Sequence, residues 1–235
     1  MILVSKGEET RQAILSRAFE LATVGGLVGL SIGKLAEETG LSKSGLFAHF
    51  GSKEALEVAV VEEASRQFVQ DVMLPALREP RGEPRLRALF AQWMKWGNRI
   101  GGCFFVGASA ELDDKPCPAR DALVRVQKDW VDELAKATRI AVSEGHFRND
   151  VDPDQFAFEL YSIMLGAHLF SRFLREPATR NRTYEAFERL VAAARSPNYT
   201  PAPAPSPRAS SSSIPSRTRF FRRSRVELVQ SPATK

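Results

Sequence analysis

Polar and small side chains cluster in the segment KSGLFAHF, residues 43–50. Lys43 and Ser44 stand at the start of a helical pattern, on the side that its apolar residues leave exposed. A lysine at such a position can donate to guanine O6 or N7, and the methyl group of Ala48 can contact that of thymine. Gly45 either allows a close backbone approach or only keeps the turn loose. This chemistry is base recognition in DNA, provided that the chain presents the segment as an exposed helix.

Two short helices joined by a tight turn would present it. Ser31 is a candidate N-cap for the first helix, whose inner face is apolar. Gly40 falls where that helix must stop, since glycine adopts the left-handed conformation of a helix end without steric cost. Ser42 can cap the second helix, Lys43 to Phe50. These are the cues of a helix-turn-helix, whose second helix lies in the major groove of DNA.

Three blocks of sequence surround and include this motif. The first is RQAIL with AFEL, within residues 11–21, and the second is LA with GLS, within residues 35–42. The third is GLFAHFGSKEAL, residues 45–56. On these blocks, Thr10 to Leu56 resemble the N-terminal DNA-binding domain of the TetR family of one-component transcription regulators.

The resemblance implies which further side chains hold the DNA backbone. Ser31, His49 and Lys53 would contact phosphates, aided by free N–H groups at the start of the helix that follows Ser52. Outside this motif, His49 would be interpreted as an ordinary surface histidine. The family usually has tyrosine where this chain has Phe47, so a hydroxyl that can bind a phosphate is missing there. The implied partner is double-stranded DNA, with a palindromic operator for a dimer.

The composition is that of an ordinary globular protein, with 43% hydrophobic and 26% charged residues among 235. No apolar run approaches the roughly 18 residues that a bilayer span needs, so no membrane partner is expected. Met1 to Val4 lack the features of a secretory signal, and we expect a cytoplasmic protein. Cys103 and Cys117 provide neither a disulfide framework nor a four-ligand metal set. Ordinary reduced cysteines are expected, with a thiol sensor as the alternative.

The net charge of +5 comes from the end of the chain. From Pro197 onward, seven basic residues and one acidic residue contribute +6, which leaves Met1 to Ser196 at −1. Charge therefore gives no indication that the folded part binds nucleic acid. The segment from Pro197 is rich in proline and serine and is expected to be disordered. Its Arg217 to Arg225 cluster either adds sequence-independent DNA affinity or is only a solvated tail.

Helical periodicity continues through the body of the chain, so the predicted fold class is all-α. We expect a flexible N-terminal arm over 1–9 and a helix-turn-helix DNA-binding domain over 10–56, whose last helix continues to about 78. A helical effector-binding and dimerisation domain follows over 79–196, and a disordered basic tail over 197–235. Pro75 is expected to bend or shorten the end of the linking helix. Further helices are predicted over 85–99, 103–112, 119–143, 154–174 and 179–195.

The second domain would bind a small-molecule effector, as the resemblance implies. The candidate ligand-binding residues are Trp93, Met94, Trp96, Phe104, Phe105, Met164 and His168. Together they suit a large apolar ligand. Taken one by one, the same residues are better interpreted as ordinary core.

The predicted helix 154–174 is apolar on two sides. One side can pack on the protein's own core, but the other needs a wider cover than the last helix provides. A two-fold partner using the same pair of helices would supply that cover, as dimers of the TetR family do. The predicted homodimer interface consists of Phe158, Tyr161, Leu165, Leu169, Phe187, Leu190 and Val191.

Enzymatic activity is not expected, because His49, His146 and His168 lie in separate segments without a nucleophile or acid nearby in sequence. The acidic residues between 111 and 114 have the types of metal ligands, but a solvated loop is the better interpretation. No metal or cofactor is expected. The sequence therefore predicts a ligand-responsive DNA-binding repressor. The alternative is a dimeric helical small-molecule-binding protein without specific DNA binding.

Overall fold

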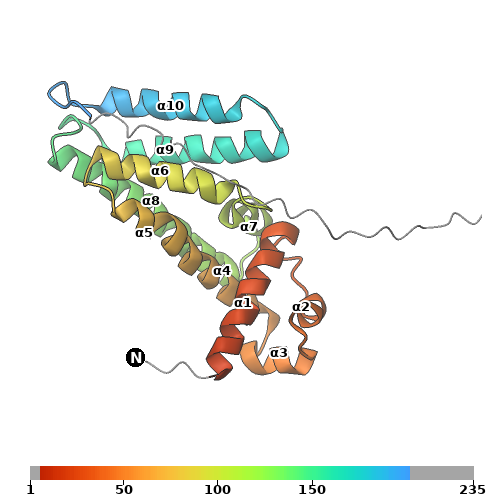
Figure 1. Cartoon of the computed structure of the whole chain (residues 1–235). Helices are drawn as coiled ribbons and strands as arrows, with labels where there is room; N and C mark the ends of the chain where they lie inside the picture. Colours follow the sequence, from red (N-terminus) through yellow and green to blue (C-terminus); the bar gives the residue numbers. More distant parts are fainter. Residues whose placement is uncertain (1–5, 202–235) are drawn as a thin grey trace, which may run out of the picture. The chain divides into compact units, whose positions relative to one another are not determined.

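The structure is a computed structural model that describes residues 6–201. All regular elements in this part are helices, as predicted (Figure 1). The first are α1 (Lys6–Gly25), α2 (Ile32–Thr39), α3 (Lys43–Phe50), α4 (Lys53–Phe68), the π-helical segment η1 (Val69–Met73) and α5 (Leu74–Leu77). The chain continues through α6 (Glu83–Gly97), α7 (Phe104–Leu112), α8 (Pro118–Ser143), α9 (Pro153–His168), the π-helical segment η2 (Leu169–Phe173) and α10 (Thr179–Ala194). Between residues 6 and 201, no helix is long and apolar enough to span a membrane.

Serine hydroxyls and glycines set the ends of the helices around the helix-turn-helix. The hydroxyls of Ser31, Ser42 and Ser52 each accept a hydrogen bond from the backbone N–H three residues on, at 3.0–3.1 Å. Gly40 ends α2 with φ of 67°, the left-handed conformation that glycine tolerates best. Local sequence therefore fixes the turn between α2 and α3 as predicted.

The first helix begins at Lys6, earlier than the predicted start at Thr10, so residues 6–9 of the expected arm are helical. Glu8 and Glu9 lie in its first turn, where carboxylates interact favourably with the helix dipole. Residues 1–5, and the part of the predicted 197–235 tail from 202 onward, lie outside the described residues. Tyr199, in the described beginning of that tail, stacks on the ring of His146 with centroids 4.0 Å apart.

The linking helix runs from Lys53 to Leu77 through α4, η1 and α5. A π turn precedes Pro75, in which the N–H of Leu74 bonds to the carbonyl of Val69. Proline lacks an N–H and its ring clashes with the carbonyl four residues earlier, and a local widening of the helix accommodates both effects. The proline thus alters the hydrogen-bond pattern of the helix without ending it.

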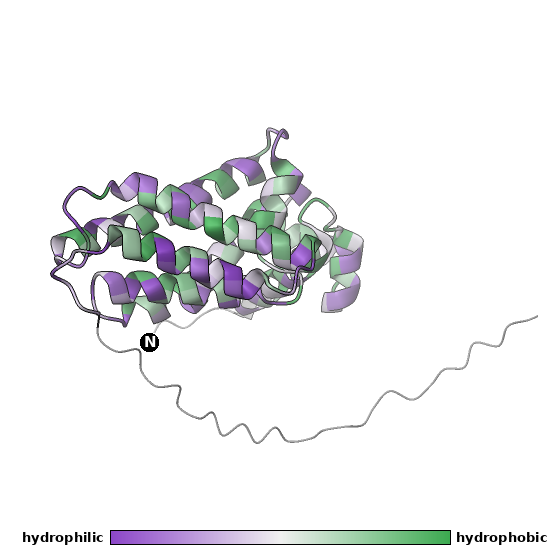
Figure 2. Ribbon diagram, turned by 90° about the horizontal axis from the view of Figure 1, so that it is seen from above, coloured by the Kyte–Doolittle hydropathy of each residue, from purple (hydrophilic) through white to green (hydrophobic). Residues whose placement is uncertain are grey.

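Beyond α5, four long helices form a bundle, in which α8 packs on α4 and α9, and α10 packs on α9 (Figure 1). The short α7 lies between this bundle and α1. Hydrophilic and hydrophobic residues alternate along the bundle helices, as amphipathic helices around a shared core require (Figure 2). The bounds of α6, α8 and α10 lie within about two residues of the predicted ones, which is the usual uncertainty at helix ends. The helix predicted over 154–174 corresponds to α9 followed by the π-helical segment η2, which ends at Phe173.

The predicted dimer face requires a correction. Phe187 and Val191 of α10 are buried within the chain itself, and the Phe187 ring stacks on Phe90 of α6 at 3.9 Å. Tyr161 also points inward, and its hydroxyl donates to Gln127 of α8 at 2.9 Å. Phe187 and Val191 are not available to a partner chain in this structure because α10 uses its apolar stripe to cover the bundle core. Tyr161 of α9 is directed to α8 instead. Leu190 is half-buried against that core.

Candidate nucleic-acid interface and effector cavities

The second helix of the helix-turn-helix divides cleanly into a buried and an exposed side. Leu46 and Phe50 face the core. The side chains on the opposite side are exposed, and they belong to Lys43, Ser44, Phe47 and Ala48. Gly45 is half-buried. The structure therefore presents the predicted base-contacting residues together on one helix face, while the apolar side anchors that face to α1, α2 and α4.

The residues predicted to contact phosphates differ in their burial and in the hydrogen bonds that they already make within the chain. Ser31 is exposed, and its hydroxyl accepts the capping N–H, which leaves its own proton free to donate. His49 is half-buried beside Phe50. Lys53 donates from Nζ to the carbonyl of Val28 at 3.0 Å and pairs with the Glu57 carboxylate at 3.5 Å, so part of its donor capacity is already used within the fold.

A carboxylate competes for the N-terminus of α4. Glu54 lies in the first turn, and hydrogen bonds from its own backbone N–H and from Ser52 lower the pKa of its carboxyl group. The N–H groups there were predicted to aid phosphate binding, and Glu54 adds negative charge to the same place. The sequence analysis did not identify this residue. An acidic side chain two positions after a serine cap is nevertheless a sequence sign that the helix N-terminus already has a negative charge nearby.

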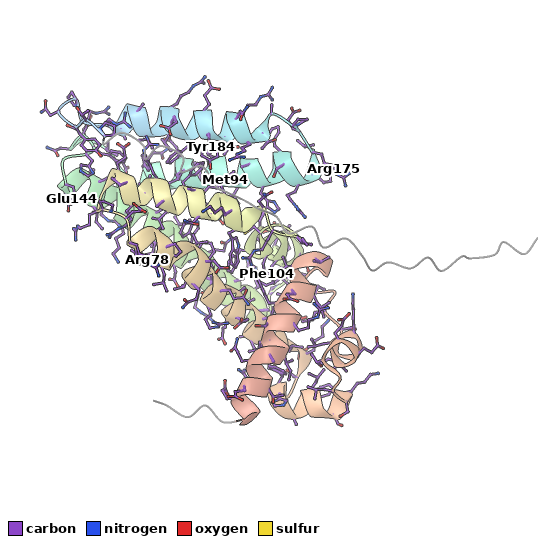
Figure 3. All side chains as sticks on the ribbon, in the orientation of Figure 1. Arg78, Met94, Phe104, Glu144, Arg175 and Tyr184 are labelled. Atoms are coloured by element: carbon purple, nitrogen blue, oxygen red, sulfur yellow. The ribbon has the colours of Figure 1, made fainter. Side chains whose placement is uncertain are left out.

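Two of the cavities in the described part of the chain are lined by residues of the predicted ligand set. The smaller, of about 150 Å³, is lined by Trp93 and Phe105 of the predicted ligand set, and also by Ser65, Phe68, Val69, Met73, Cys103, Val126, Gln127, Asp129, Trp130, Glu133 and Tyr161. The larger, of about 290 Å³, is lined by Trp93, Met94 and His168 together with residues such as Tyr184 of α10. Figure 3 labels Met94 on α6 and Tyr184 on α10, which face the same cavity.

Trp96, Phe104 and Met164 line neither of these two cavities and are buried. Trp96 and Phe104 both pack on Phe19 of α1, with ring centroids 6.0 and 5.6 Å from it. In this structure all three residues are part of the buried core. The rings of Trp96 and Phe104 belong to the aromatic cluster between α1 and the bundle.

The smaller cavity is mostly apolar but has a short polar edge. The Tyr161 hydroxyl donates to Gln127 Oε1 at 2.9 Å, and Gln127 Nε2 donates to Ser109 Oγ at 3.3 Å. Burial raises the pKa of the Tyr161 hydroxyl and that of the Cys103 thiol. Trp130 is buried, and its indole N–H has no hydrogen-bond partner among the described residues. An unpaired buried donor is rare in folded proteins.

The outer side of α9 and η2 carries an exposed apolar surface. Phe158 is 66% exposed and Leu169 is 50% exposed, and both were predicted at the dimer interface with Leu165, which is 38% exposed. Phe170, Phe173 and Leu174 extend this surface and were not in the predicted set. We call these six residues the α9 face. Contiguous exposed apolar residues of this kind mark interaction sites in folded proteins.

The carboxylate of Glu111 also forms hydrogen bonds within the chain. It accepts hydrogen bonds from the backbone N–H groups of Leu27 and Val28. The described residues contain no group of three or more acidic, histidine or cysteine side chains placed to hold a metal ion. The interpretation as a solvated loop was therefore wrong for Glu111. No local sequence pattern predicts its hydrogen bonds with Leu27 and Val28.

Two family comparisons match most of the described chain. Residues 14–60 match a family described as bacterial regulatory proteins, tetR family. Residues 82–187 match one described as tetracyclin repressor-like, C-terminal domain. Among curated relatives, the HTH-type transcriptional repressor NemR of Escherichia coli K12 is 26% identical over 200 residues, covering 83% of this chain and 96% of NemR. The HTH-type transcriptional repressor DhaR of Mycobacterium sp. GP1 is 25% identical over 179 residues, covering 73% of this chain and 84% of DhaR.

Solved structures show the same fold. A TetR-family regulator from Cytophaga hutchinsonii superposes with a TM-score of 0.74 at 23% identity, covering 83% of this chain and 98% of that one. The reduced form of E. coli NemR gives a TM-score of 0.65 at 24% identity, covering 79% of this chain and 94% of NemR.

Proposed function

We propose that this chain, which belongs to the TetR family of transcriptional regulators, is a homodimeric repressor that a small, largely apolar effector releases from a palindromic operator. The family consists of DNA-binding regulators rather than enzymes, and both curated relatives are transcriptional repressors. The observation that carries the proposal is the exposed side of α3, held outward by a capped helix-turn-helix.

At the operator, Lys43 and Ser44 donate to base edges and Ala48 contacts a thymine methyl, with Gly45 permitting close approach. Phe47 offers ring contact only. Ser31, His49 and Lys53 bind phosphates, as the resemblance to the family implies.

The second copy covers the α9 face. Residues Phe158, Leu165 and Leu169 remain exposed in the single chain, so a two-fold partner presenting the same face would bury them symmetrically. Two recognition helices held in this way must enter successive major grooves about 34–36 Å apart.

The effector binds in the bundle. The cavity of about 150 Å³ between α4, α6, α7, α8 and α9 is large enough for a benzene-sized apolar group. Its lining is mainly apolar and aromatic, so the ligand class that fits best is a small aromatic compound. His168 and Met94 line the neighbouring cavity of about 290 Å³, which would hold a longer substituent.

The test is selection of bound sequences from random DNA with the full chain, followed by titration at two salt concentrations. A palindrome bound with steep salt dependence is expected, because phosphate contacts release counterions. Lys43→Ala should abolish the sequence preference. Lys136→Ala, a matched change on the exposed side of α8, should leave it intact.

The opposing result is sequence-blind binding that disappears when residues 202–235 are deleted. DNA contact would then come from the basic end of the chain, and the dimeric ligand-binding protein would be the correct interpretation.

A further inference from the structure

A single carboxylate from the bundle holds the loop that leads into the helix-turn-helix. Glu111, near the end of α7, accepts from the N–H of Leu27 at 3.2 Å through Oε1. It accepts from the N–H of Val28 at 2.8 Å through Oε2. Both oxygens are thus engaged by consecutive backbone donors, an arrangement in which charge-assisted bonds are strong and directional.

The positive φ of Gly26 favours glycine at this position, and the Glu111 carboxylate lies close to it. A Cβ added at Gly26, where φ is +85°, would lie 2.6 Å from the same Glu111 oxygen. The carbonyl of Val28, which belongs to the next peptide group, accepts a hydrogen bond from Nζ of Lys53 in α4. The backbone of Val28 is therefore held on both sides of its Cα, by α7 through the N–H and by α4 through the carbonyl.

A second close approach strengthens this junction. A Cβ at Gly101, in the loop before α7, would lie 2.3 Å from the carbonyl oxygen of Thr23 in α1. The loop that begins α7 and the last turn of α7 therefore both contact the end of α1 and the residues that follow it. A shift of α7 cannot leave this segment in place.

The opposite end of α7 forms part of the wall of the smaller cavity. Cys103, its N-cap, and Phe105 both line that cavity. From Phe105 to Glu111 the helix rises only about 9 Å, at 1.5 Å per residue. A short rigid helix thus has an effector-facing end and an end bonded to the DNA-binding domain.

We propose that Glu111 is a positioning residue through which α7 couples the cavity to the helix-turn-helix. This inference rests on the proposed function and specifies its regulation. A ligand that displaces Phe105 moves Glu111, and with it the loop of residues 26–30 that ends at the Ser31 cap of α2. The orientation of α2 and α3 then depends on α7 as well as on the linking helix α4.

The bond itself is tested by amide hydrogen exchange in the full chain, without DNA. In Glu111→Ala, the amides of Leu27 and Val28 should exchange about tenfold faster or more, because each loses a charged acceptor. Glu111→Gln keeps one acceptor oxygen and should be intermediate. The control is Asp114→Asn, an exposed carboxylate for which the structure shows no hydrogen bond or ion pair among the described residues. Equal exchange in the Glu111 variants and the control would overturn the proposal.

The coupling is tested by a double-mutant cycle on operator affinity, with the duplex selected as above. Phe105→Leu alters the cavity end of α7 and should change the dissociation constant by about threefold or more, within the usual range of coupling between sites. In the Glu111→Ala background the same change should have less than about a 1.5-fold effect, because the connection is cut. The same factor in both backgrounds, or no effect in either, would overturn the coupling.

Failure of the proposed function gives a different result. If the wild-type chain binds no specific DNA sequence, the regulator is refuted, while the exchange rates of Leu27 and Val28 still decide whether Glu111 holds the loop.

Discussion

Replacing Glu63 should loosen the attachment of α1 to the linking helix. Its carboxylate is only 3% exposed in the middle of α4, yet it is surrounded by donors. Gln12 of α1 donates to it at 2.7 Å, Gln67 at 2.7 Å, and Arg66 through Nε and Nη2 at 2.8 and 2.7 Å. The Ser16 hydroxyl of α1 lies 3.4 Å away. A buried charge with this many donors is fully compensated, so its removal leaves them without their acceptor.

The size of the effect follows from how exposed the partners are. Removing one member of a buried ion pair typically costs about 3–5 kcal/mol, when the other charge stays buried. Here the Arg66 side chain is 52% exposed and can return to water. We therefore expect Glu63→Ala to lower the free energy of unfolding by about 2 kcal/mol. For a chain of this size, that corresponds to a fall in Tm of about 4–8 °C.

The pH dependence gives a second signature. Burial disfavours the charged form, but hydrogen bonds from Arg66, Gln67 and Gln12 outweigh it and hold the pKa of Glu63 below its ordinary value. A depressed folded-state pKa contributes stability above the unfolded pKa of about 4.3, and that contribution is lost as pH falls through the folded pKa. The difference in stability between wild type and Glu63→Gln should be constant from about pH 7 to 5 and shrink below about pH 4.

The assay is urea unfolding at fixed protein concentration, since association shifts apparent stability. Glu62→Ala is the matched control, because Glu62 is the exposed neighbour on the same helix. A loss below about 0.5 kcal/mol in Glu63→Ala, or an equal loss in Glu62→Ala, would refute this account of how α1 is held.

Three further changes test other parts of the fold and the site. Ser42→Ala removes the cap of α3 and should cost about 1 kcal/mol of stability, measured by thermal melting, and weaken operator binding measured by fluorescence anisotropy. Phe158→Arg and Leu169→Arg place charges on the α9 face and should convert the proposed dimer to a monomer in sedimentation. The helical circular dichroism spectrum should stay unchanged, and a retained dimer would exclude this face as the interface. Tyr161→Phe leaves Gln127 Oε1 without its donor and should cost about 1 kcal/mol in urea unfolding, whereas a neutral result would mean that water replaces the hydroxyl.

The helix-turn-helix was predictable because its signals are local. Each of the three helices has a serine cap directly before its first residue, namely Ser31, Ser42 and Ser52. Gly40 adopts the left-handed conformation, which glycine tolerates because it has no Cβ. The exposed face of α3 follows from the same short-range pattern, since burial of Leu46 decides where Ser44 and Ala48 point. These parts of the candidate site needed no knowledge of the rest of the fold.

The contacts that the sequence did not reveal are long-range. Glu111 meets Val28 across 83 positions of sequence, and nothing near either residue indicates the pairing. Phe187 was assigned to a dimer face because its helix is amphipathic, but amphipathicity does not say whether the cover comes from Phe90 or from a second copy. Likewise, the enclosure of a cavity by Phe105 but not by Phe104 depends on side-chain packing between five helices.

Two carboxylates hold the DNA-binding domain to the rest of the molecule, and the smaller cavity contacts both helices that carry them. Glu63 of α4 binds the start of α1, and Glu111 of α7 binds the loop after its end. Phe68, just over one turn beyond Glu63, lines the cavity together with Phe105 of α7. Both carboxylates bond donors outside their own helices, so neither helix can shift without straining or breaking those bonds. Under the proposed coupling, an occupant of this cavity would act both on the helix that Glu63 joins to α1 and on the helix that Glu111 joins to the loop after α1, and would reorient the helix-turn-helix without unfolding it.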